Sequence, residues 1–138
     1  TGSLAQPFTT GRKDCSPRWS EDGTRLGFIS SRDGEAKVFA LSMSGGDAHC
    51  IASHRNGIDS FEWSPDGKKI ATHSSRDGKK LDVYVLNADG SNWIALTNND
   101  AADIYPVWSR DGKKIIFSST RNNGGGYDIN VFVADWIE

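Results

Sequence analysis

The chain has 138 residues, of which 36% are hydrophobic and 25% are charged, and these values fit one ordinary globular domain. Its net charge of -2 provides no overall field that would attract nucleic acid, so we expect no nucleic-acid partner. No apolar run approaches the roughly 20 residues that a membrane-spanning helix needs, so we expect no membrane insertion.

The predicted strands follow one another in a regular order from the N-terminal side. Residues 17–20 read PRWS, residues 22–23 read Asp-Gly and residues 25–30 read RLGFIS. This pattern predicts two strands joined by a tight turn, because Gly adopts the positive φ that such a turn requires. A third strand is predicted over residues 36–42 and, after a second Gly turn, a fourth over residues 48–52.

The same pattern occurs twice more downstream. Trp19, Trp63 and Trp108 lie 44 and 45 residues apart, and each is followed by Ser, an Asp-Gly turn and an apolar strand. The later copies predict strands over residues 61–64, 68–74, 81–87, 93–97, 106–109, 113–119 and 128–134. Four short strands in a repeat of about 45 residues, without helical periodicity, are typical of β-propeller blades. We therefore predict an all-β fold with three blades per chain, each built on four antiparallel strands.

The two ends of the chain are offset relative to the repeats. The third copy stops after its third strand, whereas residues 1–13 resemble the fourth strand at 93–97. We therefore assign a strand within 1–13 to the last blade of a partner copy, followed by three blades at 14–55, 56–100 and 101–138. Because propellers typically have four to eight blades, we predict a homodimer that forms one six-bladed ring by exchanging its N-terminal strands. The alternative is that the chain is excised from a longer propeller.

Two long segments carry a resemblance to a known family. Residues 103–135 read DIYPVWSRDGKKIIFSSTRNNGGGYDINVFVAD, and residues 61–97 read FEWSPDGKKIATHSSRDGKKLDVYVLNADGSNWIALT. They resemble the WD-like repeat of TolB-type propellers, and the resemblance covers essentially the whole chain. Glu21 and Arg110 replace the proline of the turn, and Phe61 replaces the proline before the Trp. The resemblance implies six blades, a partner-binding role and a periplasmic location, although such repeats also occur in propellers attached to peptidases and other enzymes.

Propeller strand order sorts the loops onto two faces. The turns after each first strand share one face, and the loops before each first strand and after each second strand share the other, at the mouth of the central channel. Charged loops at such a mouth are where a propeller would bind a ligand or a peptide. The predicted ligand-binding residues are Arg32, His54, Arg55, Asp59, Arg76, Asp103, Tyr105 and Arg121.

Some of these residues recur in each copy, which supports a second interpretation. An Asp before each first strand and an Arg after each second strand are expected to lock neighbouring blades together, as Asp14 with Arg32, Asp59 with Arg76 and Asp103 with Arg121. Binding specificity is then expected where the copies differ, at His54, Arg55 and residues 123–127. The three repeated tryptophans are predicted to form the core between blades, since their burial removes a large apolar area from water.

The sequence carries none of the common catalytic motifs. It contains no Gly-x-Ser-x-Gly, no His-Glu-x-x-His and no phosphate-binding Gly-rich loop, and its two cysteines can form at most one disulfide. We therefore predict no catalytic residues, no metal site and no cofactor, and a non-catalytic scaffold for protein or peptide binding. The alternative functions are the propeller module of a hydrolase or peptidase and a lyase-type enzyme with its site at the channel mouth.

Overall fold

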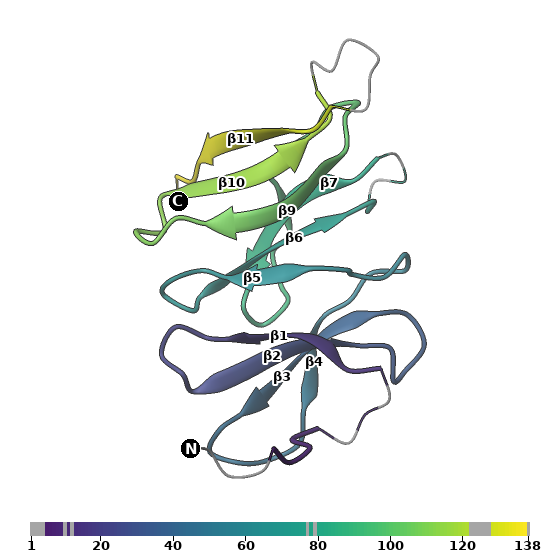
Figure 1. The fold of residues 1–138 in the computed structure, drawn as a ribbon, viewed down its shortest axis with the longest axis vertical. Coiled ribbons are helices and arrows are strands. Elements are labelled where there is room, and N and C mark those ends of the chain that lie inside the picture. Colours follow the sequence, from purple (N-terminus) through teal and green to yellow (C-terminus); the bar gives the residue numbers. More distant parts are fainter. Residues whose placement is uncertain are drawn as a thin grey trace.

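The computed structural model describes residues 5–9, 11, 13–76, 78, 80–121 and 128–137. In this part of the chain all regular structure is β, with eleven strands in three antiparallel sheets. The sheets stack along the long axis of the molecule, with blade 1 at the bottom of Figure 1 and blade 3 at the top. The predicted all-β architecture of propeller-like blades is therefore confirmed. None of the described residues forms a helix that is long and apolar enough to cross a membrane.

Each sheet follows the order of the sequence. Blade 1 contains β1 (Cys15–Trp19), β2 (Arg25–Ser30), β3 (Lys37–Ser42) and β4 (His49–Ala52). Blade 2 contains β5 (Phe61–Trp63), β6 (Lys69–Ser74), β7 (Asp82–Asn87) and β8 (Ile94–Ala95). Blade 3 contains β9 (Asp103–Trp108), β10 (Lys114–Ser119) and β11 (Asn130–Asp135). Within the described residues, β11 is therefore an edge strand, whereas its counterparts β3 and β7 pair with a fourth strand.

The turn after each repeated Trp has the same structure in all three blades. In blade 2 the Ser64 hydroxyl donates to Asp66 Oδ1 at 2.7 Å and accepts the Lys69 backbone N–H at 2.8 Å. Gly67 follows with a φ of 67°, a conformation that L side chains rarely adopt. Blades 1 and 3 repeat this arrangement with Ser20, Asp22 and Gly23 and with Ser109, Asp111 and Gly112. The repeated Trp-Ser-x-Asp-Gly motif therefore forms a hairpin turn, which is part of the scaffold.

Two clusters of buried side chains join neighbouring blades. One packs Ile29, Val38 and Ile51 of blade 1 against blade 2, and the other packs blade 2 against blade 3. Trp63 and Trp108 belong to these clusters and are only 7% and 9% exposed, as predicted. Trp19 departs from the prediction, because 57% of its surface is exposed. In the single chain no other blade covers that side of blade 1.

Candidate functional site

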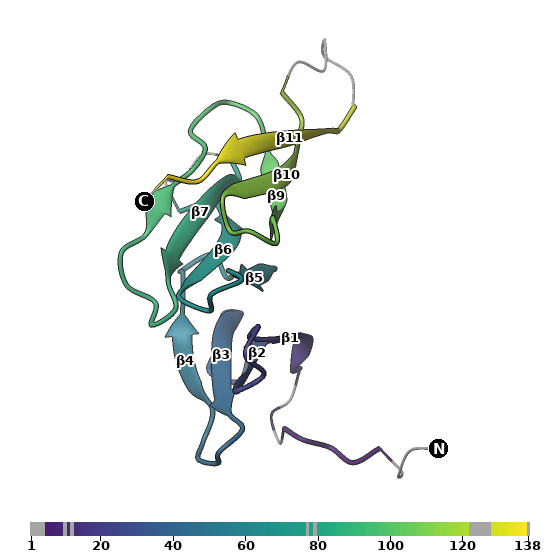
Figure 2. The same cartoon turned by 90° about the vertical axis from the view of Figure 1, so that its left-hand side faces the viewer.

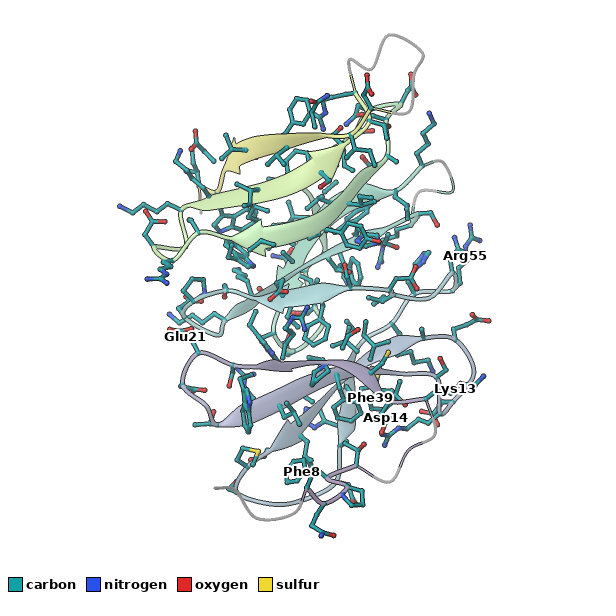
Figure 3. All side chains as sticks on the ribbon, in the orientation of Figure 1. Phe8, Lys13, Asp14, Glu21, Phe39 and Arg55 are labelled. Atoms are coloured by element: carbon teal, nitrogen blue, oxygen red, sulfur yellow. The ribbon has the colours of Figure 1, made fainter. Side chains whose placement is uncertain are left out.

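The loops of the predicted channel mouth gather along one edge of the molecule, which we call the mouth face. The first residues of β1, β5 and β9 and the last residues of β2, β6 and β10 lie toward the right-hand side of Figure 1. Figure 3 shows Asp14 and Arg55 toward this edge, whereas Glu21, in an Asp-Gly turn, lies at the opposite edge. The strands therefore hold the charged loops on a face separate from the turns.

Blades 1 and 3 carry an internal ion pair on this face, which we call the lock. In blade 3, Arg121 Nη2 donates to Asp103 Oδ2 at 2.7 Å, and Arg121 Nε donates to Ser119 Oγ at 2.9 Å. The guanidinium also lies 4.8 Å from the ring centre of Phe132. Blade 1 repeats these contacts with Arg32, Asp14, Ser30 and Phe39. The predicted pairing of Asp14 with Arg32 and of Asp103 with Arg121 is confirmed, but each pair lies within one blade, so the expectation that these pairs join neighbouring blades is wrong.

The carboxylates of the locks remain ionised despite their burial. Asp103 is completely buried, and burial alone would raise its pKa. The hydrogen bond from Arg121 and further hydrogen bonds outweigh this effect, so the pKa of Asp103 lies below its ordinary value. The pKa of Asp14 is lowered in the same way, with burial opposed by hydrogen bonds from Ser30, Thr9 and Arg32. In both locks the arginine and the carboxylate pair with each other, so we interpret the locks as structural groups.

Blade 2 has no lock, because an apolar residue occupies the position of the buried Asp. Ile58 and Asp103 each lie five residues before the repeated Trp of their blade. Their backbone N–H groups donate, at 2.8 and 2.7 Å respectively, to the carbonyl of the residue just before the third strand of the preceding blade. Both side chains are completely buried. Asp59 lies one position later and is exposed, so its predicted pairing with Arg76 is wrong.

Arg76 consequently occupies a different place from Arg32 and Arg121. Its guanidinium lies 4.6 Å from the ring centre of Trp93. Within the described residues no ion pair joins Arg76 to a carboxylate. Ser74, which corresponds to Ser119 of the lock, is buried, and its hydroxyl has no hydrogen-bond partner in this part of the chain. The arginine of blade 2 is therefore exposed on the mouth face, without a carboxylate partner among the described residues.

Arg76 borders an open hollow of about 510 Å³ between blades 1 and 2, which we call the basic hollow. Its lining consists of Glu35, Lys37, Ser53, His54, Arg55 and Arg76. Burial, followed by the positive charges of Arg76 and Arg55, holds the pKa of His54 below its ordinary value. Among the described lining residues, three permanent cations stand against one carboxylate, which gives this part of the hollow a positive character.

Asp59 and Tyr105 lie at another point of the mouth face, beside His73 of β6. The rings of His73 and Tyr105 meet edge to face, with centres 5.2 Å apart. His73 Nδ1 accepts the backbone N–H of Tyr105 at 3.3 Å, so this nitrogen carries no proton and the Ser60 hydroxyl, 2.8 Å away, donates to it. Burial lowers the pKa of His73, and the charge of Asp59 offsets this only in part. A neutral histidine therefore joins blade 2 to blade 3.

The structure divides the eight predicted site residues into three groups. Arg32, Asp103 and Arg121 belong to the locks, Asp59 and Tyr105 lie beside His73, and His54, Arg55 and Arg76 line the basic hollow. The predicted binding segment 123–127 lies outside the described residues. Among those that are described, no group of three or more His, Cys, Asp or Glu side chains could hold a metal ion, and both cysteines are free thiols.

Sequence reasoning missed three residues that matter on this face. Counting five residues back from each repeated Trp would have found Ile58 in place of an Asp. Lys37 and His73 gave no such signal, because the fold alone brings Lys37 of blade 1 beside Arg76 of blade 2 and His73 beside Tyr105 of blade 3.

Comparisons with known proteins agree with this architecture. Residues 9–131 match the family model described as the TolB β-propeller domain. The Tol-Pal system protein TolB of Bordetella pertussis is 42% identical over 110 residues, which cover 79% of this chain and 25% of that protein. The chain thus spans about a quarter of the length of the curated relatives it matches.

Solved structures show the same fold. The putative TolB from Agrobacterium tumefaciens superposes with a TM-score of 0.77 at 24% identity, over 92% of this chain and 47% of that one. An oligogalacturonate lyase in complex with manganese superposes with a TM-score of 0.64 at 16% identity, over 85% of this chain and 35% of that one. At these identities the likeness concerns the fold alone.

Proposed function

The chain belongs to the TolB β-propeller family, and on this premise we propose that it is a non-catalytic scaffold for protein or peptide binding, completed as a six-bladed ring by a second copy. Its mouth face receives the partner, and the ring arises from the pairing of open blade faces and the exchange of N-terminal strands. The relatives belong by name to the Tol-Pal system, and we extend their family resemblance to a periplasmic location for this chain.

The observation that carries the assembly is the contrast among the repeated tryptophans. Trp63 and Trp108 are buried because a preceding blade covers them, and the Arg25 guanidinium of blade 1 lies 4.6 Å from the ring centre of Trp63. Trp19 occupies the equivalent position on blade 1 and is 57% exposed. A large aromatic side chain in this setting favours a partner blade, since its burial removes a large apolar area from water.

The open face of blade 3 supports the same assembly from the other side. Val131 and Val133 of β11 are 74% and 60% exposed, whereas Val38, at the register position of Val131 in blade 1, is fully buried against blade 2. Ile116 of β10 is 44% exposed, and its counterpart Ala71 is fully buried. These side chains form an apolar surface of the kind that the other blades use to bind the next blade.

Side-chain sizes at the two open faces are complementary. Inside the chain, Gly27 leaves room for Phe61, whose ring would lie only 2.7 Å from a Cβ on Gly27. The residue that corresponds to Phe61 in blade 1 is Pro17, and the residue that corresponds to Gly27 in blade 3 is Ile116. A large residue on blade 3 thus meets a smaller one on a second copy of blade 1, which preserves the filling of the interface.

The N-terminal segment supports strand exchange. Residues 5–9 form no strand within this chain, and Figure 2 shows the described N-terminal part leading away from the sheets. Thr9 contributes to the lowered pKa of Asp14 in blade 1, as Thr97, just after β8, does to that of Asp103 in blade 3. This relation aligns residues 5–8 with the fourth strand of a blade, and the unpaired edge of β11 offers that strand a partner in a second copy.

Solution mass measured by light scattering tests the proposal. We expect the mass of two chains, and we expect Trp19→Ala to raise the dissociation constant about 30-fold or more, because a central aromatic anchor contributes about 2 kcal/mol or more. Ile94→Ala is the matched control, since Ile94 is an exposed apolar residue of β8 in blade 2, which lies between the other two blades. The mass of one chain at all concentrations, or equal effects of the two substitutions, would contradict the assembly.

A further inference from the structure

We propose that the basic hollow between blades 1 and 2 binds an acidic segment of a partner protein through the carboxylates of that segment. The inference rests on the proposed function, because it names the chemistry that the mouth face recognises. It depends on three properties of the hollow: an arginine without a carboxylate partner among the described residues, an aromatic support that holds this arginine, and an excess of positive charge in the described lining.

The first property is that Arg76 has the donors of a lock arginine, whereas no carboxylate among the described residues pairs with it. In blade 1, Arg32 Nη2 donates to both oxygens of Asp14, at 3.1 and 3.0 Å. In blade 2, Ile58 fills the buried position of that Asp, and no described carboxylate pairs with Arg76. A guanidinium matches a carboxylate in planar, two-bond geometry. An incoming carboxylate therefore supplies the partner that blade 2 lacks.

The second property is that Arg76 is held in place before any partner binds. Its guanidinium stacks on Trp93, and the Trp93 ring is fixed by a hydrogen bond from Nε1 to the Gly90 carbonyl at 3.1 Å. The ring of Tyr84 meets Trp93 edge to face, with centres 5.9 Å apart. Because the side chain is already restrained, binding costs less conformational entropy than it would for a free surface arginine.

The third property is the sign of the charge around Arg76. Lys37 and Arg55 line the same hollow, and Glu35 is the one acidic residue among its described lining residues. Burial is the largest cause that lowers the pKa of His54, and the positive charges of Arg76 and Arg55 lower this pKa further. Such a site attracts carboxylates, and the attraction weakens as salt screens it.

The shape of the surface favours a protein segment over a small molecule. The basic hollow is open, and it continues through Ser53 and Arg76 into a second hollow lined by β4 and the turn before β8. Small ligands favour enclosed, apolar pockets, whereas a chain segment can follow an open polar surface. Asp89 in the second hollow confines the positive charge to the side of Arg76, so we expect the acidic residues of the partner to lie between Lys37 and Arg76.

Fluorescence anisotropy with three labelled decapeptides tests this site: decaglutamate, decaglutamine and decalysine. We expect decaglutamate alone to bind at low ionic strength, and we expect its affinity to fall as salt increases. Arg76→Gln should weaken this binding at least tenfold, and Arg55→Gln should weaken it as well. Arg110→Gln is the matched control, because Arg110 is an exposed arginine in the turn after β9, on the opposite face.

The outcomes separate this inference from the proposed function. Binding of decaglutamine that Arg76→Gln leaves unchanged would overturn the acidic-segment site while leaving a peptide-binding scaffold. Inorganic phosphate, at the same concentration as the peptide carboxylates, should not displace decaglutamate. If it does, the hollow binds any small anion, and the inference is overturned. Equal effects of Arg76→Gln and Arg110→Gln would do the same. Both walls of the hollow belong to one chain, so peptide binding does not depend on the ring. The mass measured by light scattering therefore tests the six-bladed ring separately.

Discussion

The mouth end of blade 2 differs from that of blades 1 and 3, although the turn ends of all three blades are alike. Each turn repeats the Ser-Asp hydrogen bond at 2.6 to 2.7 Å and a Gly with φ of 67° to 69°. At the mouth, blades 1 and 3 contain the buried lock, whereas blade 2 has Ile58 in place of the Asp and an exposed Arg76. With this apolar residue in place of the Asp, the arginine of blade 2 has no carboxylate partner among the described residues.

The largest expected effect comes from breaking a lock. Arg121→Ala leaves the completely buried carboxylate of Asp103 without its charge partner, and we expect it to lower the free energy of unfolding by about 3 kcal/mol. Arg76→Ala removes an exposed side chain and one stacking contact, and we expect it to cost less than about 1 kcal/mol. Urea unfolding at one fixed protein concentration measures both values. Equal losses of unfolding free energy in the two variants would mean that Arg121 is no more important to the structure than Arg76.

A smaller effect is expected from building a lock into blade 2. Ile58→Asp introduces a carboxylate near the Ser74 hydroxyl, which has no partner among the described residues, and it should draw Arg76 inward. The substitution removes a buried apolar side chain, so we expect a net loss of stability. The ion pair between the introduced carboxylate and Arg76 should offset part of that loss. We therefore expect a favourable coupling free energy of about 1 to 2 kcal/mol between the two side chains. A double-mutant cycle that combines Ile58→Asp with Arg76→Ala measures this coupling.

The control for this cycle is Ile58→Asn, which has a similar shape without the charge. We expect no coupling between Ile58→Asn and Arg76→Ala. The charged variant should also lose affinity for decaglutamate, because its Arg76 is occupied internally. A cycle without coupling would mean that Ile58 is not the reason why Arg76 is exposed.

The sequence predicted the blades well because their signals are local. Each Asp-Gly turn and each alternating strand is specified by residues within a few positions of one another, so the three hairpins and their order could be read directly. The locks of blades 1 and 3 followed from the same repetition. The prediction failed where repetition was assumed: Asp59 was aligned with Asp103, although the backbone hydrogen bond places Ile58 there.

The rest of the mouth face could not be predicted because it depends on contacts between blades. Lys37 and Arg76 are far apart in the sequence, and only the stacking of blades 1 and 2 brings them to one hollow. The stacking of Arg76 on Trp93 likewise depends on the absence of a carboxylate, which no local pattern reports. The exposure of Trp19 could not be predicted from its repeat either, since its neighbours in the sequence match those of the two buried tryptophans.

The smallest expected effect concerns His73, at the second point where blade 2 differs from its neighbours, since Ile29 and Ser118 occupy this register position in blades 1 and 3. Burial lowers the pKa of His73 from its ordinary value of 6.5, so the unfolded chain takes up the proton more readily than the folded chain. Stability should therefore be full above pH 6.5 and should fall as the pH drops below it. Urea unfolding at pH 7.5 and 5.5 should show a loss that is smaller in His73→Asn, while His49→Asn, at an exposed position of β4, keeps the loss of the unmodified chain. An identical loss in both variants would mean that His73 does not carry the pH dependence of the junction between blades 2 and 3.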